Sequence, residues 1–276
     1  MAHSPVPAGS LPAGTLPAGP LSAGPLSAGR STGPAGSVRT AVVWEVLSDA
    51  LAEADPAGRG LDIVDAGGGT GGFAVPLAAA GHRVTVVDPS PDSLAALQRR
   101  AAERGLGDRV VGLQGDLADL GALVALASTD LVLCHSVLEV VEDPALALQA
   151  AASVLRPGGR LSLLVANRDA AVLARALAGR PDEAAHLLTD PAGRWGPADG
   201  VARRWTPEQV RQLVEAAGLR VEQLHGVRVV ADLVPSAVLD SEPGAAAALL
   251  ALERALSGRA PFRDLATQLH VLAAAG

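Results

Sequence analysis

The sequence contains no lysine and no tyrosine, since all 22 of its basic residues are arginine, and it has a single cysteine, Cys134, among 276 residues. Without lysine, the chain can form neither a Walker-type phosphate loop, nor a Schiff base with pyridoxal phosphate, nor a protein-kinase site. A single thiol excludes disulfide frameworks and cysteine-rich zinc sites, because each needs at least two thiols. These absences favour a protein of the reducing cytosol.

Long apolar runs and an excess of positive charge are also missing. No stretch reaches the roughly 18 uninterrupted apolar residues of a membrane span, and the N-terminus lacks a charged segment followed by an apolar core. We therefore expect a cytoplasmic protein with no membrane partner and no metal, and the sequence leaves its oligomeric state open. The formal net charge of −7 argues against general adhesion to nucleic acid but allows a local basic patch.

Residues 1–36 differ in composition from the rest of the chain. Gly, Pro, Ser, Ala and Leu dominate, a five-residue unit recurs as SLPAG, TLPAG, PLSAG and PLSAG, and Arg30 carries the only charge. Prolines remove backbone donors and glycines raise the entropy cost of ordering, while the leucines lie too far apart to form a core. We predict a disordered tail, with a signal or transit segment as the alternative. Residues 37–276 fit one domain.

Short apolar strands alternate with helices through the first half of this domain. Helical spacing predicts a first helix at residues 38–54. Strands are then predicted at 61–66, 83–88, 110–115, 131–135 and 160–166, with helices at 73–80, 91–104 and 144–155. Continuous apolar strands separated by helices are typical of a parallel sheet covered on both faces. The sequence predicts a doubly wound α/β domain.

The pattern changes after Asn167. We predict a helical, loop-rich insert at about residues 168–204 and a helix at 207–217. Two apolar stretches, 219–230 and 265–274, flank an alanine-rich helix at 244–256 and could complete the sheet as an antiparallel pair. A second mononucleotide-binding half of the dehydrogenase kind is not visible.

A glycine-rich loop directly follows the first predicted strand. Its sequence is Val64-Asp65-Ala66-Gly67-Gly68-Gly69-Thr70-Gly71-Gly72. Glycines let the chain turn sharply and let a ligand approach the backbone without meeting a β-carbon. The run fits both the G-x-G-x-x-G of dinucleotide enzymes and the G-x-G-x-G of S-adenosylmethionine enzymes, and a plain tight turn is a further alternative.

Acidic residues distinguish between these interpretations. Asp88 ends the second strand, where a carboxylate can accept both ribose hydroxyls, although it could equally cap the next helix. Gly115-Asp116 ends the third strand, near where an adenine amino group would lie, or forms a turn. Asp65 can hold the loop or a methionine amino group. These acids fall at the carboxyl ends of consecutive strands, where open α/β sheets bind ligands.

Together with the Leu155-Arg156-Pro157-Gly158-Gly159 turn before strand five, these motifs resemble the class I S-adenosylmethionine-dependent methyltransferases over about residues 37–167. A Rossmann-like doubly wound sheet and S-adenosyl-L-methionine as the cofactor are what this resemblance implies.

A closer resemblance reaches the C-terminus. It rests on 135–144, running His-Ser-Val-Leu-Glu-Val-Val-Glu-Asp-Pro, on 153–163, on 226–229, Gly-Val-Arg-Val, and on 269–271, Leu-His-Val. These stretches are similar to the tRNA 5-carboxymethoxyuridine methyltransferases, which esterify the carboxylate of a modified wobble uridine. The resemblance implies cofactor-binding roles for Arg39, Asp65, Gly67, Gly68, Gly69, Asp88, Gly115, Asp116 and His135. Taken singly, Arg39 could be a solvated helix residue and His135 a capped strand end.

Methyl transfer to an ionised carboxylate needs alignment and desolvation but no base, and an arginine fork suits such an acceptor. Candidates for this positioning are Arg168, Arg203, Arg204 and Arg228, of which Arg228 lies in the matched Gly-Val-Arg-Val stretch. Asn167, the only asparagine, ends strand five and is either a positioning residue or a turn residue. His135 and Glu139 could act as bases if the acceptor were a hydroxyl. No catalytic residue is assigned among these groups.

The net charge of the insert bears on which acceptor the protein methylates. Residues 168–204 hold six arginines against five acids, a net of +1, so their electrostatic attraction for RNA is weak. We expect a methyltransferase acting on tRNA, with a small-molecule O-methyltransferase for an acid or alcohol as the alternative. A non-enzymatic cofactor-binding or interaction protein is the third possibility.

Overall fold

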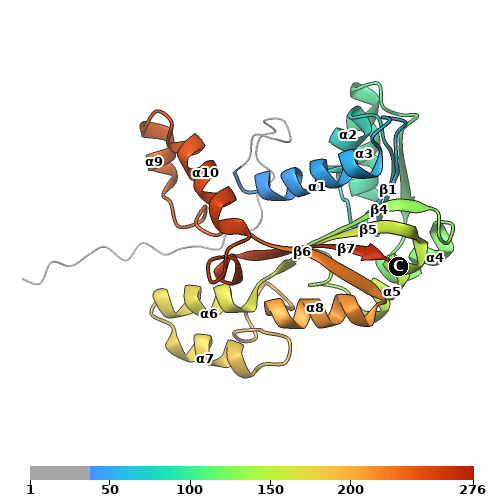
Figure 1. The fold of residues 1–276 in the computed structure, drawn as a ribbon. Coiled ribbons are helices and arrows are strands. Elements are labelled where there is room, and N and C mark those ends of the chain that lie inside the picture. The colour runs from blue at the N-terminus through green and yellow to red at the C-terminus, as the bar shows by residue number, and fades with distance from the viewer. Residues whose placement is uncertain (1–37) are drawn as a thin grey trace, which may run out of the picture. The chain divides into compact units, whose positions relative to one another are not determined.

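The computed structural model describes residues 38–276, so the tail predicted at residues 1–36 lies outside the described residues. Strands and helices alternate along the first half, as Figure 1 shows. The elements there are α1 (Ala41–Ala54), β1 (Asp62–Ala66), α2 (Ala74–Ala79), β2 (Arg83–Asp88), α3 (Pro91–Glu103), β3 (Val110–Gln114), η1 (Leu117–Asp119), α4 (Leu120–Leu123), β4 (Thr129–His135), α5 (Pro144–Val154) and β5 (Leu155–Ala166).

The second half adds helices and an antiparallel strand pair. Its elements are α6 (Arg168–Leu177), α7 (Pro181–Thr189), α8 (Pro207–Ala216), β6 (Leu219–Val227), α9 (Ser236–Ser241), α10 (Ala245–Ser257), η2 (Arg263–Leu265) and β7 (Gln268–Ala275). In the part of the chain that the structure describes, no helix is long and apolar enough to cross a membrane.

One seven-stranded sheet, in the order β3-β2-β1-β4-β5-β7-β6, runs through the domain. The five strands of the first half pair in parallel, whereas β7 lies antiparallel between β5 and β6. This arrangement confirms the doubly wound, mostly parallel sheet with an antiparallel C-terminal pair. Since β1 to β5 are parallel, their carboxyl ends share one edge, and the end of β6 and the start of β7 meet them there.

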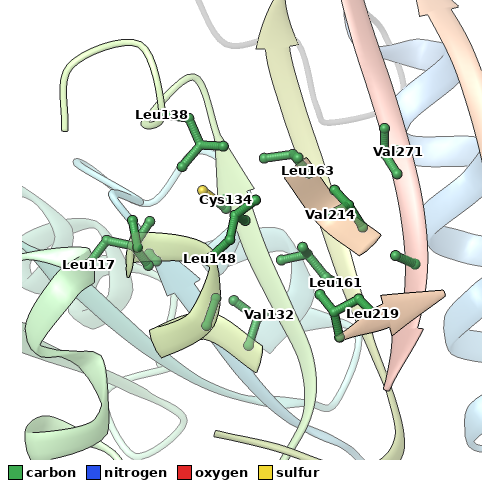
Figure 2. Packing of buried hydrophobic residues seen from close by; sticks show 14 of the residues in the cluster. Leu117, Val132, Cys134, Leu138, Leu148, Leu161, Leu163, Val214, Leu219 and Val271 are labelled. Carbon is green, nitrogen blue, oxygen red and sulfur yellow. The ribbon is translucent and has the colours of Figure 1, made fainter. Parts of the chain in front are cut away.

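Each face of the sheet carries its own hydrophobic core. One core joins the sheet to α5 and α8, and Figure 2 shows its packing around Cys134, Leu163 and Val271. The other joins the sheet to α1, α2 and α3 through residues such as Leu47, Leu77 and Leu97. Alternate residues of one strand serve opposite cores, as Leu133 and Cys134 do on β4. Both faces are therefore covered, as the apolar strands predicted.

Three strand ends differ from the predictions by three residues or more, each for a visible reason. Strand β5 begins at Leu155 rather than residue 160, because Leu155 already pairs with Thr129 before a register shift. Strand β6 ends at Val227 rather than residue 230, because the next backbone N–H groups donate to Glu253. Strand β7 begins at Gln268 rather than residue 265, because a 3₁₀ turn occupies the preceding residues.

The insert predicted at about residues 168–204 forms α6, α7 and a loop. Its two ends pair with each other, since the N–H of Arg168 donates to the carbonyl of Trp205 at 2.9 Å and the N–H of Trp205 donates to Ala166 at 3.1 Å. The insert thus leaves and rejoins the fold at the carboxyl end of β5.

A buried carboxylate on α10 holds the segment that follows β6. Glu253 is fully buried, and its two oxygens accept hydrogen bonds from the backbone of Val229, Val230 and Ala231 at 3.0, 2.7 and 2.6 Å. A buried charge is stable only when it is well hydrogen-bonded, and three donors meet that need. The alanine-rich helix predicted at 244–256 gave no sign of this role.

We expect Glu253→Gln to lower the free energy of unfolding by about 2–3 kcal/mol, because an amide replaces one acceptor oxygen with a donor that faces backbone N–H groups. Urea unfolding followed by circular dichroism measures the change. The exposed Glu103→Gln on α3 is the matched control and should change stability by no more than about 0.5 kcal/mol. Equal stability of the two variants would contradict the role of Glu253.

Candidate functional site

The glycine loop turns sharply between β1 and α2 and is packed tightly. The N–H of Gly67 donates to the carbonyl of Val87 at 2.7 Å, and its φ of +72° lies in the left-handed region. A β-carbon on Gly67 would lie 2.3 Å from Cγ2 of Val137, and one on Gly68 would lie 2.5 Å from the carboxyl carbon of Asp65. Any side chain at these positions would disturb the loop, so the glycines are required by its shape.

Asp88 ties the end of β2 to this loop. One carboxylate oxygen accepts the N–H of Gly69 at 2.9 Å, and the other accepts the N–H of Ser90 at 2.9 Å. Each oxygen keeps a second lone pair, so the carboxylate can still receive ribose hydroxyls. The cap of α3 is Ser90, which accepts from the N–H of Ser93, so Asp88 is not needed as a helix cap.

Asp65 is buried beneath the loop. Burial, reinforced by the negative charge of Asp88, raises the pKa of the Asp65 carboxyl to about 7, while a hydrogen bond from the backbone of Ala74 acts in the opposite direction. Oxygen Oδ2 is buried and has no hydrogen-bond partner among the described residues. Such an atom calls for a donor from outside the chain, and the ammonium group of a methionine moiety is one. The residues present therefore fit the expected cofactor.

Gly115 and Asp116 follow β3 at the same edge. The N–H of Gly115 donates to the carbonyl of Asp88 at 3.3 Å, and a β-carbon on Gly115 would lie 2.4 Å from Leu123. Asp116 is exposed, and its side chain makes no capping hydrogen bond to the short helix that follows. Its carboxylate is available for a ligand.

His135 ends β4 and belongs to a hydrogen-bonded row that crosses the sheet. Its Nε2 lies 2.9 Å from Oγ of Ser162, which lies 2.7 Å from Nε2 of His270. Ser162 has one hydroxyl proton, so one imidazole must donate to it while the other accepts. Burial lowers the pKa of His135 to about 3, so the ring is neutral and a weak base. Phe73 packs edge-on against it, at 4.6 Å between ring centroids.

Arg39 and Arg228 contact one carboxylate. Nε of Arg39 lies 3.6 Å from Oδ1 of Asp232, and Nη2 of Arg228 forms an ion pair with Oδ2. Arg39 precedes α1 and is largely exposed, whereas Arg228 follows β6 and is half-buried. The structure thus brings together the residue expected to meet the cofactor and the residue expected to meet the acceptor, through an acid that sequence reasoning missed.

The other acceptor-side candidates already have partners within the chain. Asn167 caps α6 by accepting the N–H of Asp169, and its Nδ2 donates to the carbonyls of Asp264 at 2.8 Å and Ala266 at 2.7 Å. Arg204 forms a two-pronged ion pair with Asp199, at 2.6 and 3.0 Å.

Arg168 and Arg203 bind backbone carbonyls, of Pro191 and of Val141 respectively, both at 2.9 Å. A cavity of about 370 Å³ adjoins Arg203, Arg204 and Trp205 between the insert and α8, and no residue of the glycine loop lines it.

Within residues 38–276, no group of three or more His, Cys, Asp or Glu side chains is placed to hold a metal ion. Cys134 is fully buried in the core between the sheet and α5, and burial raises the pKa of its thiol. A buried thiol of this kind serves packing.

Comparisons with known proteins agree with this geometry. Residues 64–163 match the model of a methyltransferase domain family. The tRNA 5-carboxymethoxyuridine methyltransferase of Escherichia coli K12 is 32% identical over 238 residues, which is 86% of this chain and 88% of that protein. A ubiquinone biosynthesis O-methyltransferase of Xanthomonas axonopodis pv. citri is 32% identical over 176 residues, covering 64% of this chain and 69% of that protein.

Solved structures share the fold at lower identity. An S-adenosylmethionine-dependent methyltransferase from Mesorhizobium loti is 22% identical with a TM-score of 0.57, covering 88% of this chain and all of that one. Magnesium protoporphyrin IX methyltransferase from Synechocystis PCC 6803, with bound S-adenosylhomocysteine, is 19% identical with a TM-score of 0.56, covering 87% and 84%. The fold is thus that of class I methyltransferases.

The raised pKa of Asp65 predicts a pH dependence of ligand binding. We expect the ammonium group of S-adenosylhomocysteine to pair with the ionised carboxylate of Asp65, whose pKa is about 7. Protons compete with the ligand below that pH, so affinity should fall by up to about tenfold per pH unit between pH 7 and 5.5. Isothermal titration calorimetry over this range measures the slope, and His135, with its pKa of about 3, does not titrate there.

Asp65→Asn should flatten this slope, since an amide does not titrate. Asp92→Asn, at an exposed position in the first turn of α3, should leave the slope as in the wild type. An affinity of the wild-type protein that is constant from pH 5.5 to 7 would contradict the role of Asp65.

Proposed function

Since this chain belongs to the S-adenosylmethionine-dependent methyltransferases, we propose that its acceptor is the carboxylate of wobble 5-carboxymethoxyuridine in tRNA. The relative from Escherichia coli that is named for this reaction aligns along most of both chains. An enzyme acting on tRNA would work in the cytoplasm, in keeping with the single buried cysteine.

The proposal rests mainly on the position and partners of Arg228. It follows β6 at the edge of the sheet where the carboxyl ends of β4 and β5 lie, and its Nη2 pairs with Asp232 while its buried Nε has no partner among the described residues. Nε and Nη2 form one side of the guanidinium fork, so half of a carboxylate-binding face is unused. A carboxylate acceptor is the ligand that this face fits.

The cofactor supplies a methyl group on a positively charged sulfur. The chain's own part is to bind and orient the cofactor. Asp88 accepts the ribose hydroxyls, and Asp116 accepts the adenine amino group. Asp65 binds the ammonium group of the methionine moiety, and Arg39 binds its carboxylate. Arg228 holds the acceptor carboxylate in line with the transferred methyl group. Alignment of this kind supplies most of the rate for a displacement that moves no proton.

The titratable groups near the end of β4 favour an acceptor that is already ionised. A histidine with a pKa of about 3, as His135 has, removes protons poorly from a hydroxyl. Glu139 is buried, which raises its pKa, but one of its oxygens accepts the backbone N–H of Ala166 at 2.7 Å. A carboxylate needs neither group as a base.

A small-molecule O-methyltransferase is the second candidate. The relatives named for ubiquinone biosynthesis support it, and Oε2 of Glu139 is buried without a partner among the described residues, as a base awaiting a hydroxyl would be. The net charge of +1 in the insert also fits a small acceptor better than an RNA backbone.

Methyl transfer to tRNA distinguishes the two candidates. The purified protein, S-adenosylmethionine and tRNA that carries unesterified 5-carboxymethoxyuridine are incubated, and the digested nucleosides are analysed by mass spectrometry. We expect the methyl ester of that nucleoside to form. Unchanged tRNA, together with methyl transfer to small carboxylic or phenolic acceptors, would reject the tRNA proposal and support the second candidate.

Arg228→Gln should raise the KM for the acceptor by about 10- to 100-fold, the value of a lost charge-assisted hydrogen bond, and should change the affinity for S-adenosylhomocysteine much less. Steady-state kinetics with varied tRNA measures this effect. Arg220→Gln on the exposed part of β6, where Arg220 pairs with Glu222, is the matched control and should behave as the wild type. An unchanged KM in Arg228→Gln would remove Arg228 from acceptor binding.

A further inference from the structure

Asp232 lies between two arginines, one that precedes α1 and one that follows β6. Its Oδ1 lies 3.6 Å from Nε of Arg39, and its Oδ2 pairs with Nη2 of Arg228 and lies 3.2 Å from Oγ1 of Thr267. The carboxylate therefore receives two cations and a hydroxyl. Its side chain is 25% exposed, so water and ligands still reach it.

The surrounding backbone fixes this carboxylate at the site edge. The N–H of Thr267 donates to the carbonyl of Arg228 at 3.3 Å, and the N–H of Asn167 donates to the carbonyl of Thr267 at 3.1 Å. Beside them, Nε2 of Gln268 donates to Oγ of Ser136 at 3.2 Å, next to the end of β4. Asp232 thus belongs to the edge that holds the glycine loop.

The conformation of Arg228 indicates that its position is enforced. Its φ of +61° is unfavourable for a residue with a side chain, and the N–H groups of the next three residues all donate to Glu253. Strained backbone of this kind persists where the surrounding structure over-determines it. The guanidinium is therefore held in place by backbone as well as by its ion pair.

We propose that Asp232 is a built-in competing carboxylate, which holds Arg39 and Arg228 together and must be displaced from each by an incoming carboxylate. The methionine carboxylate of the cofactor displaces it from Arg39. At Arg228 the competitor is the acceptor carboxylate, and this second part rests on the proposed function. Any anion must outcompete an acid already attached to the chain, which disfavours weakly binding anions.

The proposal predicts different effects on two related ligands. S-Adenosylhomocysteine carries the amino-acid carboxylate, whereas methylthioadenosine has the same nucleoside and sulfur without it. Asp232→Asn removes the competing charge, so we expect it to tighten S-adenosylhomocysteine about three- to tenfold, the range of a partly exposed ion pair, and to leave methylthioadenosine unchanged. Calorimetry with the full-length protein measures both affinities.

A double-mutant cycle with Arg39→Gln links the effect to its arginine. Arg39→Gln alone should weaken S-adenosylhomocysteine but not methylthioadenosine, and Asp232→Asn should have no further effect in that background. Asp264→Asn, whose acid pairs with Arg263, is the matched control and should bind both ligands as the wild type does. The variants are compared at temperatures at which circular dichroism shows each one folded.

Three results would overturn the proposal: weaker binding of S-adenosylhomocysteine to Asp232→Asn, an equal change for both ligands, or a full effect of Asp232→Asn in the absence of Arg39. The first would make Asp232 a positioning residue for the arginines instead. None of these measurements includes an acceptor, so failure of the tRNA assay leaves this test intact. With an active acceptor, Asp232→Asn should also lower the acceptor KM, and an unchanged KM would limit the role of Asp232 to Arg39.

Discussion

The carboxylate of Asp88 determines the geometry at the cofactor end of the sheet. By accepting the N–H groups of Gly69 and Ser90, it fixes the glycine loop against the end of β2 and leads the chain into α3. This arrangement affects Asp65, which is buried near a second negative charge and has its pKa raised to about 7. A cationic ammonium group beside Asp65 would favour the ionised carboxylate, so cofactor binding as proposed would offset the cost of burying it.

The C-terminal third completes the same edge from the other side. Strand β6 is antiparallel to β7 and so runs in the direction of β5, which returns the chain to the carboxyl ends of the parallel strands, where β7 begins. Asn167 holds the turn before β7 through two backbone carbonyls, and Glu253 holds the segment after β6. These buried polar contacts hold the segments that carry Arg228 and Asp232 at this edge. Residues far from the glycine loop therefore shape the side of the site that we propose for the acceptor.

The sheet, its order of helices and the glycine loop could be predicted because they follow from local patterns: apolar runs, glycine spacing and acids at strand ends. Asp232, Glu253 and the row from His135 to His270 could not, since most of their partners lie far away in the sequence or on strands whose pairing depends on the whole fold.

 Glu253 accepts hydrogen bonds from backbone N–H groups 22 to 24 positions away in the sequence, and His270 contacts Ser162 across 108 positions. The ion pair of the neighbouring Arg254 with Glu45 joins residues 209 positions apart. Of the arginines, sequence position singled out Arg228 as a candidate, which stays a prediction, but could not reveal which guanidinium groups pair with acids of the chain.

The arginines near the site pair with acids of the same chain, which affects how the site can bind anions. Arg204 is held by Asp199, and Arg39 and Arg228 share Asp232, so the positive charge at the site is largely neutralised before any ligand arrives. With a net charge of −7, the chain offers little long-range attraction to an anion. Recognition must then rest on exchange at short range, in which a ligand carboxylate of the right shape replaces an internal one. Such exchange depends on geometry more than on charge, which would suit the proposed tRNA acceptor, where one carboxylate lies among many phosphates.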